Sequence, residues 1–318
     1  MTRTSLIFDC DPGVDDAIAL FLAFASPEDL DILAVTTVGG NVGGELTARN
    51  ARLIRQIAGR EDVPVIAGCA RPVIRELVDA GHFHGDSGLG SLPVFEPDAP
   101  LAPGHAVQFI VDAVMSRPAG SVTLAVTGPM TNLAVALALE PAIAERLGPV
   151  VIMGGARSEG GNITASAEYN IYADPDAAQR VVSSGCEIVM LGLDATHQVR
   201  ATREREAAIA AIPTPQAQAT TELLRFLSPQ EESLGTGGAS PMHDPCVIGY
   251  ILRPDLFVTR PCALQVETAS PLTLGHTAVE FRLKDPAASR VHWAVKADAD
   301  GFFDLLTGRL ARPPGGRG

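Results

Sequence analysis

The feature that most constrains the fold is a repeated alternation of short apolar runs with longer amphipathic stretches. Six apolar runs are typical of buried strands, at residues 6–8, 32–38, 63–67, 123–126, 150–153 and 188–191. Helical patterns lie between them, at 15–25, 46–58, 106–116, 132–139 and 176–184. Because strands that alternate with helices form parallel sheets, the pattern predicts an α/β fold with a doubly wound, mostly parallel central sheet and flanking helices.

The alternation changes after Thr196. Helical patterns at 203–212 and 216–227 precede a Gly/Ser-rich loop at 233–240, and another helix starts near Cys246. The remaining pattern predicts short strands at 263–267, 278–282 and 291–295 and a last helix at 301–306. We find neither a linker nor an internal repeat, so we expect a single domain over 1–311 with a mainly helical insertion. The tail at 312–318, RPPGGRG, is expected to be disordered because it cannot bury apolar surface.

Charge and composition restrict the class of partner. The formal net charge is -13, and Lys284 and Lys296 are the two lysines of the chain. Phosphate contacts need clustered basic residues, so a nucleic acid is disfavoured and a small polar substrate is expected. The five cysteines form no CxxC pair, which disfavours a disulfide framework or a zinc ribbon. With no secretory signal or membrane span in the sequence, we expect a cytoplasmic protein.

Four aspartates follow the first apolar run within eight positions: Asp9, Asp11, Asp15 and Asp16. If 6–8 is a strand, Asp9 and Asp11 leave its carboxyl end in the same direction, and Asp15 and Asp16 open a helix. One aspartate there is usually a helix cap, but four exceed what capping requires. Two charges ~4 Å apart at an effective dielectric of ~20 repel by ~4 kcal/mol, so we expect a cation. Oxygen ligands predict Ca²⁺ or Mg²⁺.

Two glycine-containing turns follow other predicted strands. The segment VTGPMTNLA at 126–134 leads into a helix, and Thr127 could offer its carbonyl or hydroxyl oxygen to a cation at the same sheet edge. Taken alone, the motif favours a Gly-Pro turn with a helix cap at Thr131. The segment VIMGGA at 151–156 predicts either a tight turn or a close approach of the backbone to a ligand.

Three loops carry polar side chains. At 161–178, Asn162, Glu168 and Asn170 suit a polyol, whose hydroxyls donate and accept at once, although a solvated loop fits these residues equally well. His243 stands beside Asp244 ahead of a helix, where Asp-Pro is a common helix start and a histidine is a candidate general acid. The glycine-rich loop at 82–90 has two histidines that are either structural or part of a mobile binding loop.

Taken together, these clusters resemble the inosine–uridine-preferring nucleoside hydrolases. DCDPGVDDAIAL looks like the N-terminal aspartate signature of that family, and TTVGGN, HGDSGLG, VTGPMTN, VIMGGA, AEYNIYADPDAA and MHDPC follow in matching order up to about residue 255. The C-terminal part is similar more loosely. The resemblance implies a nucleoside hydrolase-like doubly wound sheet around one cleft, assembly into dimers or tetramers, and hydrolysis of the N-glycosidic bond of a ribonucleoside to base and ribose at a bound Ca²⁺.

The resemblance also implies roles for individual residues. Asp11, Asp16 and Asp244 would bind the metal through carboxylates and Thr127 through its backbone carbonyl. Asp11 would also be the general base that deprotonates water, and His243 would serve the leaving base. The residues implied to bind substrate are Asp15, Asn41, His84, Met153, Asn162, Glu168, Tyr169 and Asn170.

The sequence departs from the family in the loop before His243. Several relatives have aromatic residues there that face the base, whereas Phe226 is the last aromatic of this segment. The sequence therefore predicts neither base stacking from this loop nor a preference for purines or pyrimidines. Trp293, in an apparent strand, is interpreted as core.

Two other functions remain open at this point. A metal-dependent phosphohydrolase would use Asp9 or Asp11 as nucleophile, and would need a basic residue near the phosphate, for which Lys296 is the candidate. A nucleoside- or sugar-binding protein without activity is the third hypothesis. Turnover of nucleosides and release of phosphate would distinguish the three.

Overall fold

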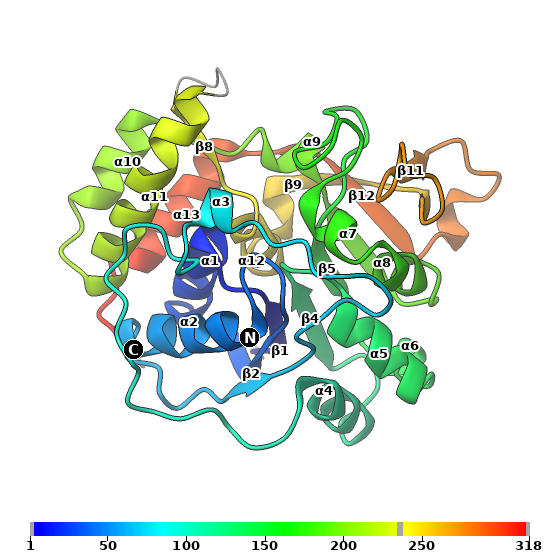
Figure 1. Ribbon diagram of the computed structural model, residues 1–318, viewed down its shortest axis with the longest axis horizontal. Helices are drawn as coiled ribbons and strands as arrows, with labels where there is room; N and C mark the ends of the chain where they lie inside the picture. Colours follow the sequence, from blue (N-terminus) through cyan, green and yellow to red (C-terminus); the bar gives the residue numbers. More distant parts are fainter. Residues whose placement is uncertain (1–2, 234–237, 316–318) are drawn as a thin grey trace.

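The computed structural model describes residues 3–233 and 238–315 (Figure 1). Its central sheet has eight strands in the order β3-β2-β1-β4-β5-β6-β12-β9. Neighbouring strands are parallel, except that β9 is antiparallel to β12. The strand bounds are β1 (Thr4–Cys10), β2 (Leu30–Thr37), β3 (Val65–Ala67), β4 (Val122–Val126), β5 (Val150–Met153), β6 (Ile188–Leu191), β9 (Phe257–Pro261) and β12 (Val291–Ala297). The predicted mostly parallel sheet is confirmed.

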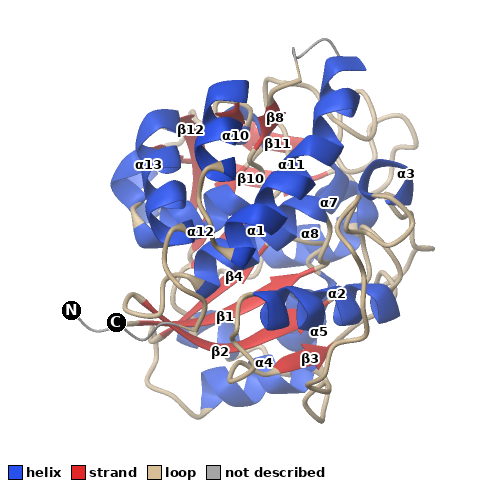
Figure 2. Cartoon of the chain, turned by 90° about the vertical axis from the view of Figure 1, so that its left-hand side faces the viewer, coloured by secondary structure: helices blue, strands red, loops and turns tan. Residues whose placement is uncertain are grey.

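Helices cover both faces of this sheet (Figures 1 and 2). On one side α1 packs against α2, α11, α12 and α13, and on the other α5 packs against α4, α6 and α8. The helix bounds are α1 (Val14–Phe24), α2 (Gly44–Ile57), α4 (Ala106–Met115), α5 (Thr131–Leu139), α6 (Ile143–Arg146), α8 (Pro175–Val182), α11 (Pro215–Ser233), α12 (Pro245–Leu252) and α13 (Ala299–Leu310).

The two faces have separate apolar cores because side chains alternate along each strand. Leu6 and Phe8 of β1 belong to the core on the α1 side, whereas Ile7 between them belongs to the core on the α5 side. All three side chains are fully buried. This burial on both faces explains why β1 is an uninterrupted apolar run in the sequence.

The predicted helical insertion is present as α10 (Arg203–Ala210) and α11, which pack against each other. The antiparallel pair β7 (Arg200–Ala201) and β8 (Ser240–Pro241) lies at the two ends of the insertion. The helix α11 continues to Ser233, beyond the predicted end at 227. Of the predicted loop at 233–240, residues 234–237 lie outside the described residues.

In the C-terminal third, the predicted strands divide between two sheets and one further strand is present. The predicted strands at 263–267 and 278–282 form a separate hairpin, β10 (Ala263–Val266) with β11 (Thr277–Glu280), whereas β12 joins the main sheet beside β6. The edge strand β9 was not predicted. It is five residues long, Phe257 is its one buried residue, and it ends at Pro261, so the strand signal in the sequence is weak.

Several one-turn elements also lie outside the predicted pattern. They are α3 (Gly81–His84), α7 (Tyr169–Ala173), α9 (Leu193–Thr196) and the 3₁₀ turns η1 (Pro254–Leu256) and η2 (Pro286–Ala288). Elements of this length are too short to show a helical periodicity in the sequence.

The expected disordered tail at 312–318 falls partly on described residues. The Gly315 N–H donates to the Ala58 carbonyl at 3.2 Å, and Gln216 Nε2 donates to the Arg312 carbonyl at 2.6 Å. Residues 316–318 lie outside the described residues. Across 3–233 and 238–315, no helix is both long and apolar enough to cross a membrane.

Candidate active site

The candidate site lies at the point in the sheet where the order of strand addition reverses. From β1 the chain adds β2 and β3 on one side, and from β4 it adds β5 and β6 on the other. The carboxyl ends of β1 and β4 therefore flank a crevice, which is where open α/β sheets bind ligands. The Thr127 N–H, just past β4, donates to the Asp9 carbonyl at 3.0 Å and ties these two strand ends together.

A cavity of about 610 Å³ opens at this edge. Most residues that the sequence assigned to substrate or metal line it, namely Asp15, Asn41, His84, Thr127, Met153, Asn162, Glu168, Tyr169, Asn170, His243 and Asp244. Asp11 and Asp16 are fully buried beside it. The structure therefore brings the predicted residues together, and their individual roles remain predictions.

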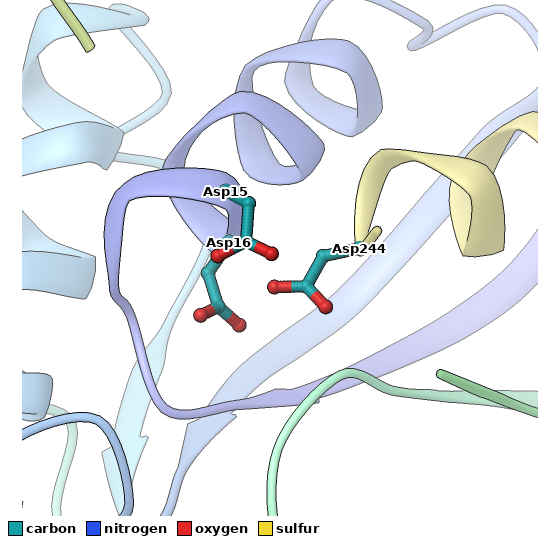
Figure 3. Close-up of side chains that lie close together, drawn as sticks. All are labelled: Asp15, Asp16 and Asp244. Carbon is teal, nitrogen blue, oxygen red and sulfur yellow. The ribbon is translucent and has the colours of Figure 1, made fainter. Parts of the chain in front are cut away.

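Three carboxylates converge at the floor of the cavity (Figure 3). Asp15 and Asp16 come from the start of α1 and Asp244 from the residue before α12, and one oxygen of each lies within 4.8 Å of the others. Burial is the largest cause that raises the pKa of Asp16 and places that of Asp244 well above its usual range, and neighbouring carboxylates raise the pKa of Asp244 further. A cation among these oxygens would relieve both costs.

Asp16 both caps the start of α1 and belongs to the carboxylate cluster. Its Oδ2 accepts from the Gly13 N–H and from Asn41 Nδ2, each at 3.0 Å, which caps the start of α1. Its Oδ1 accepts from the Thr127 hydroxyl at 2.7 Å. The helix cap proposed from the sequence is thus present, and the same carboxylate faces Asp15 and Asp244.

Asp11 has two oxygens in different surroundings. Oδ2 accepts from the Asn41 N–H at 2.7 Å, whereas Oδ1 is buried without a hydrogen-bond partner among the described residues. A Cβ atom at Gly40 would lie 2.0 Å from Oδ2, and one at Gly128 would lie 2.4 Å from Oδ1. Both glycines are therefore needed for the backbone to approach this carboxylate. Burial and the nearby Asp16 raise the pKa of Asp11 well above its usual range.

Asp9 does not belong to this convergence. Its Oδ1 accepts from the Thr36 hydroxyl at 2.6 Å and from Asn132 Nδ2 at 2.8 Å, and burial raises its pKa to about 6. The expectation that four aspartates share one site is wrong for this residue. Asp9 is still inside β1, and its side chain lies on the face of the sheet that carries Asn132 in α5. Asp11 follows the end of the strand, so the alternation of side chains between the two faces no longer determines its direction.

The polar residues on the other side of the cavity form a connected network. Glu168 caps α7: Oε1 accepts from the Asn170 N–H at 2.9 Å, and Oε2 accepts from the Gly155 N–H at 2.9 Å. Asn170 Nδ2 donates to the Thr127 carbonyl at 2.9 Å. Asn162 Oδ1 accepts from the Tyr169 N–H at 2.9 Å. Burial raises the pKa of Glu168 to about 7.

Two histidines line the cavity with one ring nitrogen already engaged. His84 Nδ1 accepts from the Val14 N–H at 3.1 Å, and burial lowers the pKa of this histidine. His243 Nδ1 lies 2.8 Å from the Thr196 hydroxyl oxygen, and burial lowers its pKa to about 3. Within residues 3–233 and 238–315, no hydrogen bond engages Nε2 of either ring, which leaves this nitrogen for a bound molecule.

The match to a family model covers nearly all of this fold. The model of the inosine-uridine preferring nucleoside hydrolases matches residues 6–304. The chain belongs to this family. It is therefore an enzyme, a nucleoside hydrolase.

Individual relatives agree over almost their full length. An inosine-uridine preferring nucleoside hydrolase from Leishmania major is 40% identical over 311 residues, covering 96% of this chain and 97% of the relative. A pyrimidine-specific ribonucleoside hydrolase from Photobacterium profundum is 44% identical over 310 residues, covering 96% and 98%. Among solved structures, a plant nucleoside hydrolase has a TM-score of 0.92 at 31% identity and covers 98% of this chain and 100% of its own.

In this nucleoside hydrolase the cavity is also lined by residues to which the sequence analysis gave no substrate, metal or catalytic role. They are Ala80, His82, Phe83, Gly161, Ile163, His197, Arg200, Gln230, Glu231, Ser233 and Pro241. Thr196, behind His243, and Gly40 and Gly128, beside Asp11, were missed as well. A usable signal existed for Thr196, because GLDATH follows the apolar run at 188–191 and so reaches the same sheet edge.

Proposed function

We propose that this nucleoside hydrolase cleaves the N-glycosidic bond of ribonucleosides, purine or pyrimidine, to free base and ribose, and that it requires Ca²⁺. The observation that carries the proposal is the meeting of buried carboxylates with a network of carboxamide and carboxylate groups in one cavity at the sheet switch point. The first group suits a hard cation and the second suits the hydroxyls of a ribose.

Asp11, Asp16, Asp244 and the Thr127 carbonyl would hold the ion. The donor set fits, because all donors are oxygens and Asp11 Oδ1 is buried with no partner among the described residues. Asp15, whose oxygen lies in the same cluster, is a further candidate ligand or a partner of the ribose. When bound, Ca²⁺ would offset the carboxylate charges and lower the pKa of a nearby water.

Asp11 would take the proton from the attacking water. The Asn41 N–H holds Oδ2 at 2.7 Å, which leaves Oδ1 as the oxygen without a hydrogen-bond partner among the described residues. A base whose second oxygen is held in this way keeps its orientation during the reaction.

Glu168, Asn162, Asn170, Asn41 and Asp15 would hold the ribose. Glu168 and Asn170 are themselves fixed by backbone hydrogen bonds, so little rotamer freedom is lost when a sugar binds. The transition state of glycosidic cleavage resembles an oxocarbenium ion, which nearby carboxylates stabilise.

His243 would serve the leaving base. The ring lines the cavity, and with Nδ1 engaged by Thr196 its Nε2 is left for the base. His84, Met153 and Tyr169 line the same cavity and complete the proposed substrate contacts. The two relatives above, at 40% and 44% identity, differ in the bases that their names specify, so we propose both base classes as substrates.

A phosphohydrolase is less well supported by the cavity. Among its described lining residues Arg200 is the one arginine, and its Nη1 lies 3.9 Å from Glu231 Oε2. Lys296, the candidate considered from the sequence, is in β12 and does not line the cavity. We further propose a cytoplasmic homodimer or homotetramer, which light scattering of the purified protein would test.

The function is tested by incubating the enzyme with inosine, uridine, adenosine and cytidine, separating bases and nucleosides by chromatography, and assaying free ribose. We expect equal amounts of base and ribose, loss of both after strong chelation, and recovery with Ca²⁺. A panel of nucleotides and sugar phosphates, assayed for inorganic phosphate, serves as the comparison. Phosphate release without base release would overturn the proposal in favour of a phosphohydrolase.

A further inference from the structure

The imidazole of His243 is held from behind by a residue with no assigned role. The Thr196 Oγ1 lies 2.8 Å from His243 Nδ1, and Thr196 is fully buried at the end of α9. This contact joins two segments that are 47 residues apart in sequence. A buried hydroxyl beside one nitrogen of a histidine determines both the orientation of the ring and the nitrogen that carries its hydrogen.

The turn that carries Thr196 is fixed by contacts on several sides. A Cβ atom at Gly192 would lie 2.4 Å from Trp293 Cζ2, so the chain passes directly against this buried ring. The Leu193 N–H donates to the Gly155 carbonyl at 2.9 Å. The Asp194 carboxylate accepts from the backbone N–H groups of residues 157 and 158, each at 2.8 Å. The Thr196 hydroxyl is therefore presented by a rigid support.

The ring is also bounded on a second side. His197, the next residue, has its ring centroid 5.6 Å from that of His243 at an interplanar angle of 56°. Its Nδ1 lies 3.0 Å from Glu159 Oε2, which holds this neighbour in place. Together Thr196 and His197 restrict how far the His243 ring can turn.

From this geometry we propose that Thr196 is a positioning residue for the leaving group: its hydroxyl donates to His243 Nδ1, so that the ring hydrogen is on Nε2 and is offered to the departing base. The inference rests on the proposed nucleoside hydrolysis and on His243 serving the base. A ring in the other tautomer would present an acceptor to the base nitrogen that receives the electron pair, and would oppose bond cleavage.

The step balances without a proton from Thr196. As the N-glycosidic bond breaks, its electron pair passes to the base, and the Nε2–H donates a hydrogen bond to the nitrogen that receives it. The attacking water gives one proton to Asp11, the released base takes one proton from solvent, and Asp11 returns its proton to solvent. Neither Thr196 nor His243 is therefore changed at the end. Thr196 acts only by fixing the ring.

The test compares two kinds of ribosyl substrate in Thr196→Val and Thr196→Ser. Valine keeps the shape and removes the hydroxyl, whereas serine keeps the hydroxyl. For inosine and uridine we expect Thr196→Val to lower kcat by ~10- to 100-fold, with KM little changed. This is part of the ~10²–10⁴-fold rate effect that is typical of a general acid or base. Thr196→Ser should restore most of the rate. p-Nitrophenyl β-ribofuranoside, whose leaving group is stable without a hydrogen bond, should be cleaved at nearly the wild-type rate by both variants.

Two controls separate positioning from a general effect on structure. Thr220→Val changes another fully buried threonine, whose hydroxyl donates to the Gln216 carbonyl at 2.7 Å away from the cavity, and should leave both substrates unaffected. In a His243→Ala background, Thr196→Val should cause no further loss with inosine. Equal losses for nucleosides and the aryl riboside, or a full additional loss in the His243→Ala background, would overturn the inference.

A spectroscopic measurement on the unmodified enzyme covers the case in which Thr196→Val does not fold. In protein labelled with ¹⁵N-histidine, the ring nitrogens of His243, assigned by their absence in His243→Ala, should report hydrogen on Nε2. Hydrogen on Nδ1 would overturn the inference even if nucleosides are hydrolysed. Failure of the wild type to hydrolyse any nucleoside would instead overturn the proposed function and this inference with it.

Discussion

The two carboxylate oxygens of Asp11 have unequal surroundings. One accepts from the Asn41 N–H at 2.7 Å, and the other is buried without a partner among the described residues. A buried carboxylate oxygen without a hydrogen bond is costly, and a catalytic role or a bound ion is one reason that such an atom persists. For Asp11 this reason fits, because the carboxylate adjoins Asn41 and Asp16 at the candidate site.

Replacing Asp11 by asparagine should therefore reduce turnover strongly and leave folding intact. We expect Asp11→Asn to lower kcat for inosine and uridine by ~10²–10⁴-fold, the typical contribution of a general base, with further loss from weakened ion binding. Because the change removes a buried charge, the melting temperature of the metal-free protein should not fall. Asp304→Asn, on an exposed position of α13, is the matched control. A near-native rate for Asp11→Asn would refute its role.

Glu168 leads to a prediction about pH. Burial raises its pKa from 4.5 to about 7, so the folded state binds this proton more tightly than the unfolded chain. Its contribution to stability is complete below pH ~4.5 and is lost as the pH rises to ~7, which amounts to about 3 kcal/mol.

The measurement is urea unfolding of metal-free wild type and Glu168→Gln at a series of pH values from 4 to 8. The glutamine cannot titrate, so the wild type should lose stability relative to the variant by about 3 kcal/mol across this interval. Comparing the two proteins at each pH cancels the other titrating groups. A difference that stays constant over the series would show that Glu168 titrates normally.

At the level of secondary-structure elements, the loop between β2 and α2 packs directly against the Asp11 carboxylate. Residue 40 must be glycine because a Cβ atom there would lie 2.0 Å from Asp11 Oδ2. At Gly43, three residues on in the same loop, a Cβ atom would meet nothing within 4 Å. Gly40 and Gly43 thus differ in whether they can accept a side chain.

Gly40→Ala should displace the Asp11 carboxylate or the loop. We expect a loss of kcat of at least ~10²-fold, because a misplacement of about 1 Å at a catalytic group has that cost. Gly43→Ala should retain activity within about twofold. Assays of both variants with inosine, alongside thermal melts, separate the effect on the site from an effect on folding. Equal activity of the two variants would contradict the assigned contact.

The elements themselves were predictable from the sequence to the extent that they are long or periodic. The strands of the sheet core and helices such as α1 and α2 have uninterrupted apolar runs or a clear apolar face. The one-turn helices α7 and α9 have neither, yet they place Glu168 and Thr196. Their positions are set by capping and by tertiary contacts such as that of Gly192 with Trp293, which no local pattern contains.

The candidate site was predictable where it rests on motifs and not where it rests on packing. The aspartates near the start of the chain predicted a cation site from residue type and position, and the family resemblance added Asp244. The structure brings Asp16 and Asp244 together with Asp15. Asn41 links Asp16 to Asp11. Asp9 was grouped with them because strand alternation was extended past Cys10, where the strand ends. The hydrogen bond between Thr196 and His243 joins distant segments, so only the fold discloses it.

At the level of the whole molecule, the sheet switch point and the two helices α1 and α12 bring together acidic groups that are more than 200 residues apart in sequence. Carboxylates held close together lower the free energy of unfolding, and a bound cation would raise it by neutralising their charge. Added Ca²⁺ should therefore raise the free energy of unfolding of the chelated enzyme, by ~2.7 kcal/mol at 100 times its Kd. Thermal melts over a Ca²⁺ series would measure this, and a melting temperature independent of Ca²⁺ would contradict it.

The most direct test of the central claim is one titration followed by two readouts. Chelated enzyme is titrated with Ca²⁺ while bound Ca²⁺ is measured by equilibrium dialysis and ribose release from inosine or uridine is measured in the same samples. We expect hydrolysis to depend on the ion, so that activity is absent at the start and rises in proportion to the bound Ca²⁺. Full turnover in protein that holds no Ca²⁺ would contradict it.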